Sequence, residues 1–173
     1  LLTATDSNTG INQVWSYNVG TDSCEQLTNY PISIDNLKVS SGNNYIVFSA
    51  EVYFGMDLEA TAQEEKYKSE LPYKAYLWSD SYVRHWDSWI EPGKWFHLFY
   101  TPMEYDSTEG IVTISDQAPV DIMADFDSDS PLRPFGDRTQ YDISPDGTKI
   151  AFVTQTGVER AWNTDDMIYI AEI

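Results

Sequence analysis

The chain is short of cysteine and of long apolar runs. Cys24 is the single cysteine among 173 residues, which excludes an intrachain disulfide and a zinc site built on several thiolates. Cys24 is expected to be a small packed side chain. The longest apolar stretch, residues 45–54, is interrupted by Ser49 and Glu51 and is far shorter than the roughly 20 residues that a helix needs to cross a bilayer. No transmembrane helix is predicted.

Basic residues are scarce as well. Ten Lys and Arg face 28 Asp and Glu, which gives a formal net charge of −18. Phosphate backbones and anionic lipid surfaces are both bound by clustered Lys and Arg, so we expect neither a nucleic acid nor a membrane as partner. Hydrophobic residues still make up 42% of the chain and aromatic residues 14%, which is enough apolar material for a folded core.

The first residues lack the features of a targeting segment. Residues 1–6 (LLTATD) contain no initiator methionine, no basic start and no long apolar segment, so they are expected to form an internal strand rather than a signal peptide. A length of 173 residues fits one domain or a piece of a larger one. We expect a fragment of a longer protein, and the sequence leaves its compartment open.

Short β-prone segments alternate with turn residues along most of the chain. Each segment is rich in Val, Ile, Thr, Tyr or Phe, and most are separated by Gly, Asn, Asp or Ser. The predicted strands are residues 1–5, 13–19, 24–28, 34–40, 45–53, 140–144, 149–154 and 167–173.

Two of the predicted hairpins share a sequence pattern. Residues 36–48 and 141–152 both read apolar-Ser-turn-polar-Ile-apolar-Phe. The Ser-Pro-Asp-Gly turn of the second copy favours a tight reversal, because Pro presets φ and Gly supplies a positive φ. Repeats of this size are typical of propeller blades or of a solenoid. We predict an all-β fold of consecutive four-stranded antiparallel propeller blades, at about residues 1–33, 34–122 and 123–173.

Several segments resemble one group of peptidases. Residues 144–152 (SPDGTKIAF) resemble the blade motif of TolB-type propellers, known as PD40-type repeats, and of the propellers in prolyl-oligopeptidase-clan serine peptidases. Other segments are similar to the dipeptidyl-peptidase V and acylaminoacyl-peptidase branch of that clan. They are residues 49–53 (SAEVY), 83–89 (VRHWDSW) followed by 97–99 (HLF), and 127–136 (DSDSPLRPFG) followed by 161–164 (AWNT).

The resemblance implies a parent enzyme with an N-terminal propeller, of which residues 1–173 are part, and a C-terminal α/β-hydrolase domain that carries a Ser-Asp-His triad. The chain contains no Gly-x-Ser-x-Gly nucleophile elbow, so we predict no catalytic residue and no cofactor in it. The implied role is to roof the active site and admit short peptides, with the hydrolase domain as partner. The alternative is a non-enzymatic TolB-like propeller that binds other proteins.

An insertion at residues 55–77 interrupts the strand pattern. Residues 58–71 are rich in Ala, Glu and Lys, which favours a short exposed helix with Asp57 as N-cap and Pro72 as its stop. One interpretation is a solvated surface excursion. The other is that the insertion borders the substrate entrance or contacts the hydrolase domain, since functional residues gather on loops.

Glu51 is the first candidate substrate-binding residue. In related dipeptidyl peptidases, propeller glutamates hold the free amino terminus of the substrate, because a carboxylate pairs well with an ammonium in a partly dry cavity. The resemblance implies such a role for Glu51 in the SAEVY segment. An ordinary strand residue that faces solvent is an equal alternative.

Arg84 and Asp87 are the other two candidates. If residues 84–87 form one strand, His85 and Asp87 share one face, and Arg84 and Trp86 share the other. A His–Asp hydrogen bond and an arginine stacked on an aromatic ring would then hold a blade together. This favours a structural role over substrate contact, and both over catalysis.

No metal site is predicted. His85 and His97 would need a third ligand that no spacing supplies. Residues 125–129 alternate carboxylates as a calcium loop does, but Ser130 and Gly136 replace the glycine and the glutamate that an EF-hand requires. A solvated loop is the favoured interpretation there. The crowded aromatic residues at 78–100 are expected to pack between blades.

Overall fold

The computed structural model describes residues 1–79, 81–157 and 160–173. Its strands are β1 (Leu2–Thr5), β2 (Asn12–Asn18), β3 (Ser23–Gln26), β4 (Ile34–Val39), β5 (Tyr45–Tyr53), β6 (Arg84–His85), β7 (Ser88–Trp89), β8 (Lys94–Asp106), β9 (Ile111–Ile114), β10 (Val120–Asp121), β11 (Tyr141–Ile143), β12 (Lys149–Thr154) and β13 (Met167–Glu172). An α-helix, α1 (Leu58–Glu70), and a 3-10 turn, η1 (Arg138–Gln140), complete the described elements.

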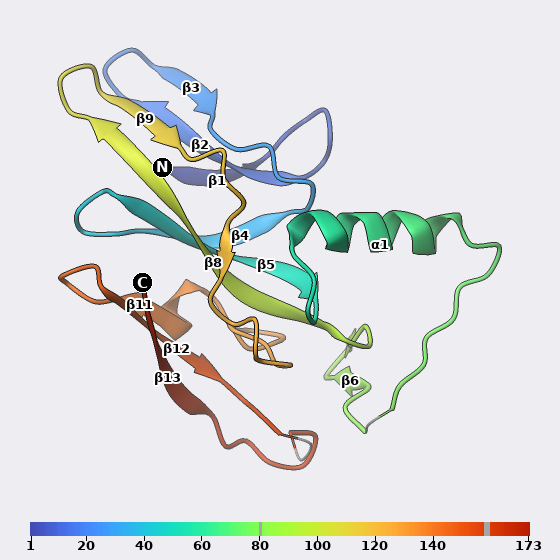
Figure 1. Cartoon of the computed structure of the whole chain (residues 1–173). Coiled ribbons are helices and arrows are strands. Elements are labelled where there is room, and N and C mark those ends of the chain that lie inside the picture. The colour runs from blue at the N-terminus through green and yellow to red at the C-terminus, as the bar shows by residue number, and fades with distance from the viewer. Residues whose placement is uncertain (80, 158–159) are drawn as a thin grey trace.

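The strands form three antiparallel sheets and one small hairpin. The N-terminal sheet has the order β1-β2-β3, the central sheet β10-β8-β5-β4 with β9 also paired to β8, and the C-terminal sheet β11-β12-β13. Figure 1 shows these sheets one after another from top to bottom. The all-β antiparallel class is confirmed, whereas the radial arrangement of blades stays a prediction because the described residues form no closed propeller.

The central sheet is larger than the four strands expected of a blade. The reason is the length of β8. Its residues 94–102 pair with β5, and two of these also pair with β10, while its last four residues, 103–106, pair with β9. The other two sheets have three strands each within the described residues.

Two hydrophobic cores join the sheets, and β5 contributes to both. Ile46 and Phe48 point into the core shared with the N-terminal sheet, where Val14 is fully buried. Tyr45 and Val47 point into the core shared with the C-terminal sheet. Because successive residues of a strand face opposite sides, a strand between two layers must be apolar on both faces. This explains the nearly continuous apolar run of β5.

The two repeated turns lie side by side. The Tyr45 hydroxyl donates to the Gly147 carbonyl at 2.9 Å, and Ser41 Oγ donates to the Pro145 carbonyl at 2.7 Å. The hairpins predicted from the shared pattern are therefore neighbours in space. The strands at 45–53 and 149–154 have the predicted bounds.

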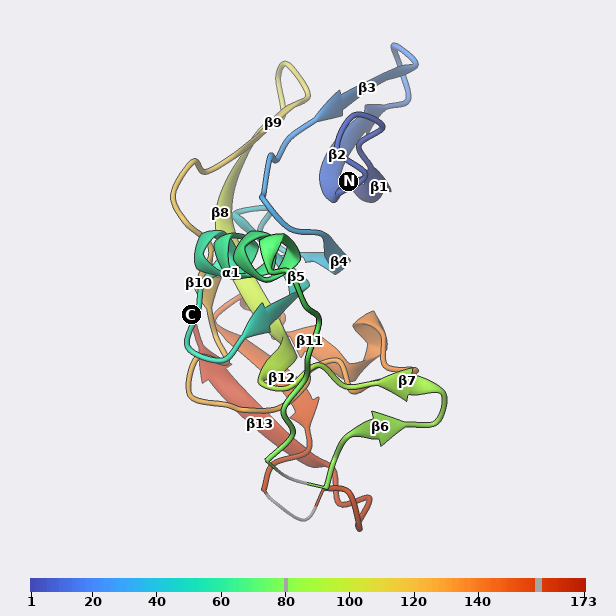
Figure 2. The ribbon, with the colours of Figure 1, turned by 90° about the vertical axis from the view of Figure 1, so that its right-hand side faces the viewer.

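The predicted helix is confirmed within one residue. Asp57 caps it by accepting a hydrogen bond from the Ala60 amide at 2.7 Å, and Leu71 follows as its C-cap. Leu58 and Thr61 are its buried residues, so α1 rests on the end of β5 by one edge. The excursion from the sheets continues beyond residue 77 into the β6–β7 hairpin, which projects to the side (Figure 2). No helix in the described part of the chain has the length and apolarity to span a bilayer.

The expectation that Cys24 is packed is wrong. Cys24 is exposed, because β3 is an edge strand of the N-terminal sheet and three of its four residues face solvent. Its cross-strand partner Tyr17 is 48% exposed, so no second layer covers this face.

Candidate functional site

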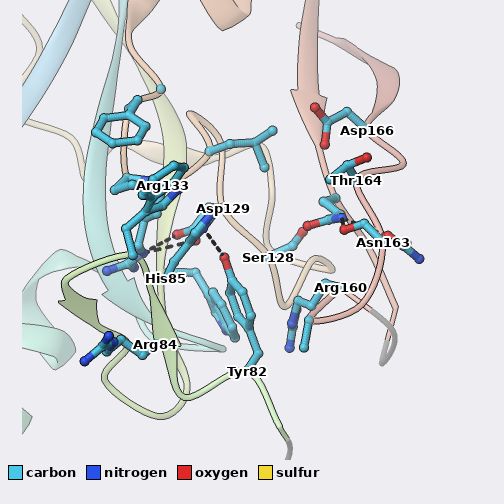
Figure 3. A pocket seen from close by; sticks show the side chains of 18 of the residues that line it. Tyr82, Arg84, His85, Ser128, Asp129, Arg133, Arg160, Asn163, Thr164 and Asp166 are labelled. Carbon is cyan, nitrogen blue, oxygen red and sulfur yellow. Dashed lines mark hydrogen bonds and ion pairs between the residues drawn. The ribbon is translucent and has the colours of Figure 1, made fainter.

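A cavity of about 670 Å³ lies where three segments from different parts of the chain meet. They are the β6–β7 hairpin, the loop at residues 128–136 that precedes η1, and the loop at 160–166 that precedes β13. Figure 3 shows Arg84 on one side of this site and Asn163, Thr164 and Asp166 on the other. All three segments include stretches that resemble the peptidase branch.

Asp129 and Arg133 form the inner wall of the cavity. The Asp129 carboxylate is buried and accepts a hydrogen bond from the Phe96 amide at 2.8 Å. Both of its oxygens lie 3.0 Å from Arg133 Nε, whose single N–H they share. Arg133 also donates to the Lys94 carbonyl at 2.9 Å, and its guanidinium lies 4.6 Å from the centre of the Phe96 ring. Burial raises the pKa of Asp129 despite the attraction of Arg133. Asp129 and Arg133 are thus joined in one hydrogen-bonded network.

Glu51 lies behind that wall, on β5. One carboxylate oxygen is 2.5 Å from an Arg133 nitrogen, and the other is 3.2 Å from Lys94 Nζ. Burial alone would raise the pKa of Glu51, but Arg133 and Lys94 outweigh it and lower the pKa. The side chain is 32% exposed, so it is neither a free carboxylate in the cavity nor an ordinary solvent-facing residue.

Lys94 connects this wall to the helix. Its ammonium, whose side chain is only 10% exposed, also pairs with Glu65 of α1. The sequence reasoning missed Lys94, Glu65, Asp129 and Arg133. The (i, i+4) spacing of Asp129 and Arg133 was a usable signal for one of these pairs, but the pairing of residues 51 and 133 is set by the tertiary fold alone.

The structure brings Arg84 to the cavity and leaves Asp87 outside the residues that line it. The Arg84 guanidinium lies 5.6 Å from the centre of the Trp89 ring. Arg84 is therefore next to an aromatic side chain as expected, but the partner is Trp89 and not Trp86. Asp87 is exposed, and it accepts a long hydrogen bond of 3.5 Å from Ser88 Oγ.

The prediction that residues 84–87 form one strand is wrong. β6 ends at His85, and Trp86 turns the chain with a φ of 51°. Such a positive φ belongs to a turn, so the alternation of faces does not extend to Asp87. As a result, His85 Nδ1 lies 2.8 Å from the Tyr82 hydroxyl instead of bonding to Asp87.

Aromatic side chains surround the mouth of the cavity. Trp86 and Phe135 meet edge to face with their ring centres 5.9 Å apart, although they are 69% and 77% exposed. Trp162, on the opposite loop, is 79% exposed. Packing in the interior accounts for Trp95 and Phe99, as predicted, but Trp86 and Trp89 face solvent.

The two histidines are used separately. His97 is buried in the central sheet, where its Nδ1 lies 2.8 Å from an Asp121 oxygen. No group of three or more His, Cys, Asp or Glu suited to a metal ion occurs in residues 1–79, 81–157 and 160–173.

The chain has clear relatives among curated proteins, although no protein-family model matches it. It is 37% identical to dipeptidyl-peptidase 4 of Giardia intestinalis over 174 residues, a match that covers 95% of the chain and 23% of that protein. It is 31% identical to a probable dipeptidyl-peptidase 5 of Aspergillus terreus and 29% to dipeptidyl-peptidase 5 of Porphyromonas gingivalis, with 71% and 53% of the chain covered and 17% and 12% of those proteins. The chain thus spans less than a quarter of the length of these relatives. It is a homologue of one segment of the dipeptidyl-peptidase 4 and 5 proteins.

Proposed function

We propose that the chain is a non-catalytic propeller segment of a serine exopeptidase of the dipeptidyl-peptidase type. Its role is to wall the chamber in front of a hydrolase domain and to restrict that chamber to short peptides. The match to a dipeptidyl-peptidase 4 over 95% of the chain carries this proposal. The names of the relatives favour it over a non-enzymatic TolB-like propeller.

The arrangement of the sheets supports the structural half of the proposal. Successive sheets follow the order of the chain, share cores and place their repeated turns side by side. Propeller blades repeat in this way around an axis. A wall built of such layers excludes folded proteins by size, while chemistry is left to groups elsewhere in the protein.

The experiment is an assay of the complete natural protein against peptides of increasing length and against a folded protein. We expect dipeptides to be released from the amino ends of short peptides, with loss of activity after treatment with a serine-directed phosphonate. Folded substrates should remain intact. Absence of dipeptide release, or equal cleavage of folded proteins, would contradict the proposal.

Glu51 offers a test of amino-terminus recognition. We propose that its carboxylate contributes to holding the substrate ammonium, in competition with its present partners Arg133 and Lys94. Glu51→Gln should raise KM several-fold for peptides with a free amino terminus and change kcat less, because a charge-assisted contact to the bound substrate is weakened.

Glu109→Gln is the matched control for this variant, since Glu109 is an exposed glutamate in the turn between β8 and β9. The control should leave KM unchanged. An unchanged KM in Glu51→Gln as well would remove Glu51 from substrate recognition.

A further inference from the structure

The cavity concentrates the positive charge of a strongly acidic chain. Of the four arginines in the sequence, Arg84, Arg133 and Arg160 line it, and among the described lining residues the carboxylates are those of Asp129 and Asp166. The chain as a whole has a net charge of −18. A site with this local balance attracts an anionic group that the rest of the surface repels.

The three arginines differ in how far they are already engaged. Arg133 is held by Asp129 and Glu51. Arg160 stacks on Trp95, with its guanidinium 4.3 Å from the ring centre, and donates to the Asp127 carbonyl. Arg84 is exposed, and within the described ranges no carboxylate lies at ion-pair distance from it. Arg84 is therefore the cation that the fold leaves available to a ligand.

The position of Arg84 suits recognition of a planar anion. Its stacking on Trp89 holds the guanidinium plane without using its N–H donors. A guanidinium presented in this way can donate two parallel hydrogen bonds to a carboxylate. Asp166 on the opposite side disfavours a multiply charged anion such as a phosphate group, which it would repel.

The aromatic rim supplies an apolar contact next to this cation. Trp86 follows Arg84 by two residues and meets Phe135 edge to face, and both rings are largely exposed. Exposed aromatic side chains around a cavity mark a binding surface. They would cover an apolar side chain adjacent to the anionic group of the ligand.

We propose that this cavity binds a peptide carboxylate at Arg84, beside an apolar or aromatic residue that packs on Trp86 and Phe135. The inference rests on the proposed function only in taking the ligand to be a peptide. The carboxylate has two possible sources, an acidic side chain or the carboxyl terminus of a short peptide.

The test is equilibrium binding, by calorimetry, of three dipeptides to the complete protein. Phe-Glu-amide carries a side-chain carboxylate, Phe-Gln carries a terminal one, and Phe-Gln-amide carries neither. At least one of the first two should bind about tenfold more tightly than Phe-Gln-amide, because hydrogen bonds to a charged group are worth that much. Tighter binding of Phe-Glu-amide identifies a side-chain carboxylate as the ligand, and tighter binding of Phe-Gln identifies the carboxyl terminus.

Arg84→Gln should abolish the preference for the dipeptides that carry a carboxylate. Arg84→Lys should retain part of it, because lysine keeps the charge but lacks the two parallel N–H donors of a guanidinium. Arg138→Gln, which alters an exposed arginine on η1 outside the cavity, should leave it unchanged. Equal binding of all three dipeptides, or a preference that survives Arg84→Gln, would overturn the proposal. Binding needs no hydrolysis, so a protein without peptidase activity could still pass this test.

Discussion

At the scale of single residues, Lys94 has the most consequential position in the molecule. Its ammonium lies between Glu51 of β5 and Glu65 of α1, and its carbonyl accepts a hydrogen bond from Arg133. Burial lowers the pKa of Lys94, but the two glutamates outweigh that effect and raise it. The side chain therefore stays charged at neutral pH and ties the helix to the cavity wall.

Lys94→Met should destabilise the protein, because it removes the ammonium that lies between Glu51 and Glu65 and leaves Glu51 with Arg133 alone. Removing one partner of a fully buried ion pair costs roughly 3–5 kcal/mol, and the partial exposure of both glutamates reduces this to about 2 kcal/mol. Urea unfolding measures the change. Lys66→Met, at an exposed position of α1, is the control and should change the free energy of unfolding by less than about 0.5 kcal/mol.

The residue scale also marks the limit of sequence reasoning. Arg84 was chosen from the sequence as a candidate substrate-binding residue; the structure places it at the cavity, and its binding role stays a prediction. Its aromatic partner is Trp89 and not the expected Trp86. The ion pairs of Glu51 were not predicted, because its partner Arg133 is 82 residues away and meets it only after the sheets have packed. Local patterns carry no information on such a contact.

At the scale of elements, hairpins with strong turn residues were predictable and the β6–β7 hairpin was not. The residues of the Ser-Pro-Asp-Gly turn predict its conformation, since a glycine adopts the φ of 72° at position 147 without strain. In contrast, the turn at Trp86 uses a tryptophan with positive φ. No residue preference signals that turn, so residues 84–87 read as a continuous strand.

Gly147→Ala tests how much the repeated turn depends on this conformation. A Cβ at position 147 would meet only ordinary contacts with the Tyr45 ring, so the cost comes from the backbone and should be about 1–2 kcal/mol. The midpoint of urea unfolding measures it. Gly42→Ala, in the equivalent turn, lacks a positive φ and would meet the Asn44 side chain at 3.4 Å, so it should cost clearly less. Equal losses in both variants would show that the conformation of Gly147 is not the cause.

At the scale of the whole molecule, the alternation of short β-prone segments and turn residues predicted the fold class, while the strand count of the central sheet depended on one element. This alternation follows from local sequence, as the strands at 45–53 and 149–154 show. The extension of β8 beyond its pairing with β5 decides that β9 joins the central sheet. The hydrophobic run from Trp95 to Phe99 is compatible with a strand of any length, so it did not predict this extension.

Acid should unfold the protein in a defined pH range. The pKa values of Glu51, Asp106 and Asp142 are lowered from their ordinary values of 4.5 for Glu and 3.8 for Asp, and hydrogen bonds from Ser144 and Thr148 lower the pKa of Asp146 to about 2. Folded-state pKa values below the unfolded ones mean that these groups stabilise the fold above about pH 4.5 and lose that contribution as the pH falls.

The free energy of unfolding, measured by urea titration at a series of pH values, should therefore decline between about pH 4.5 and pH 2. Glu51→Gln should show a shallower decline than the natural protein, because one of the titrating groups has been removed. A free energy that stays constant over this range would contradict the assignment.

Several hydrogen bonds between the central and C-terminal sheets share one pattern, in which a side chain donates and a backbone carbonyl accepts. Tyr45, Ser41, Lys38 and Tyr141 all donate in this way. A backbone carbonyl is present whatever amino acid occupies the accepting position. Most substitutions at these positions therefore leave the hydrogen bonds between the sheets in place. The donor side chains are constrained, as is Gly147 by its φ of 72°, whereas the other accepting positions can change in sequence while the sheets keep the same register against one another.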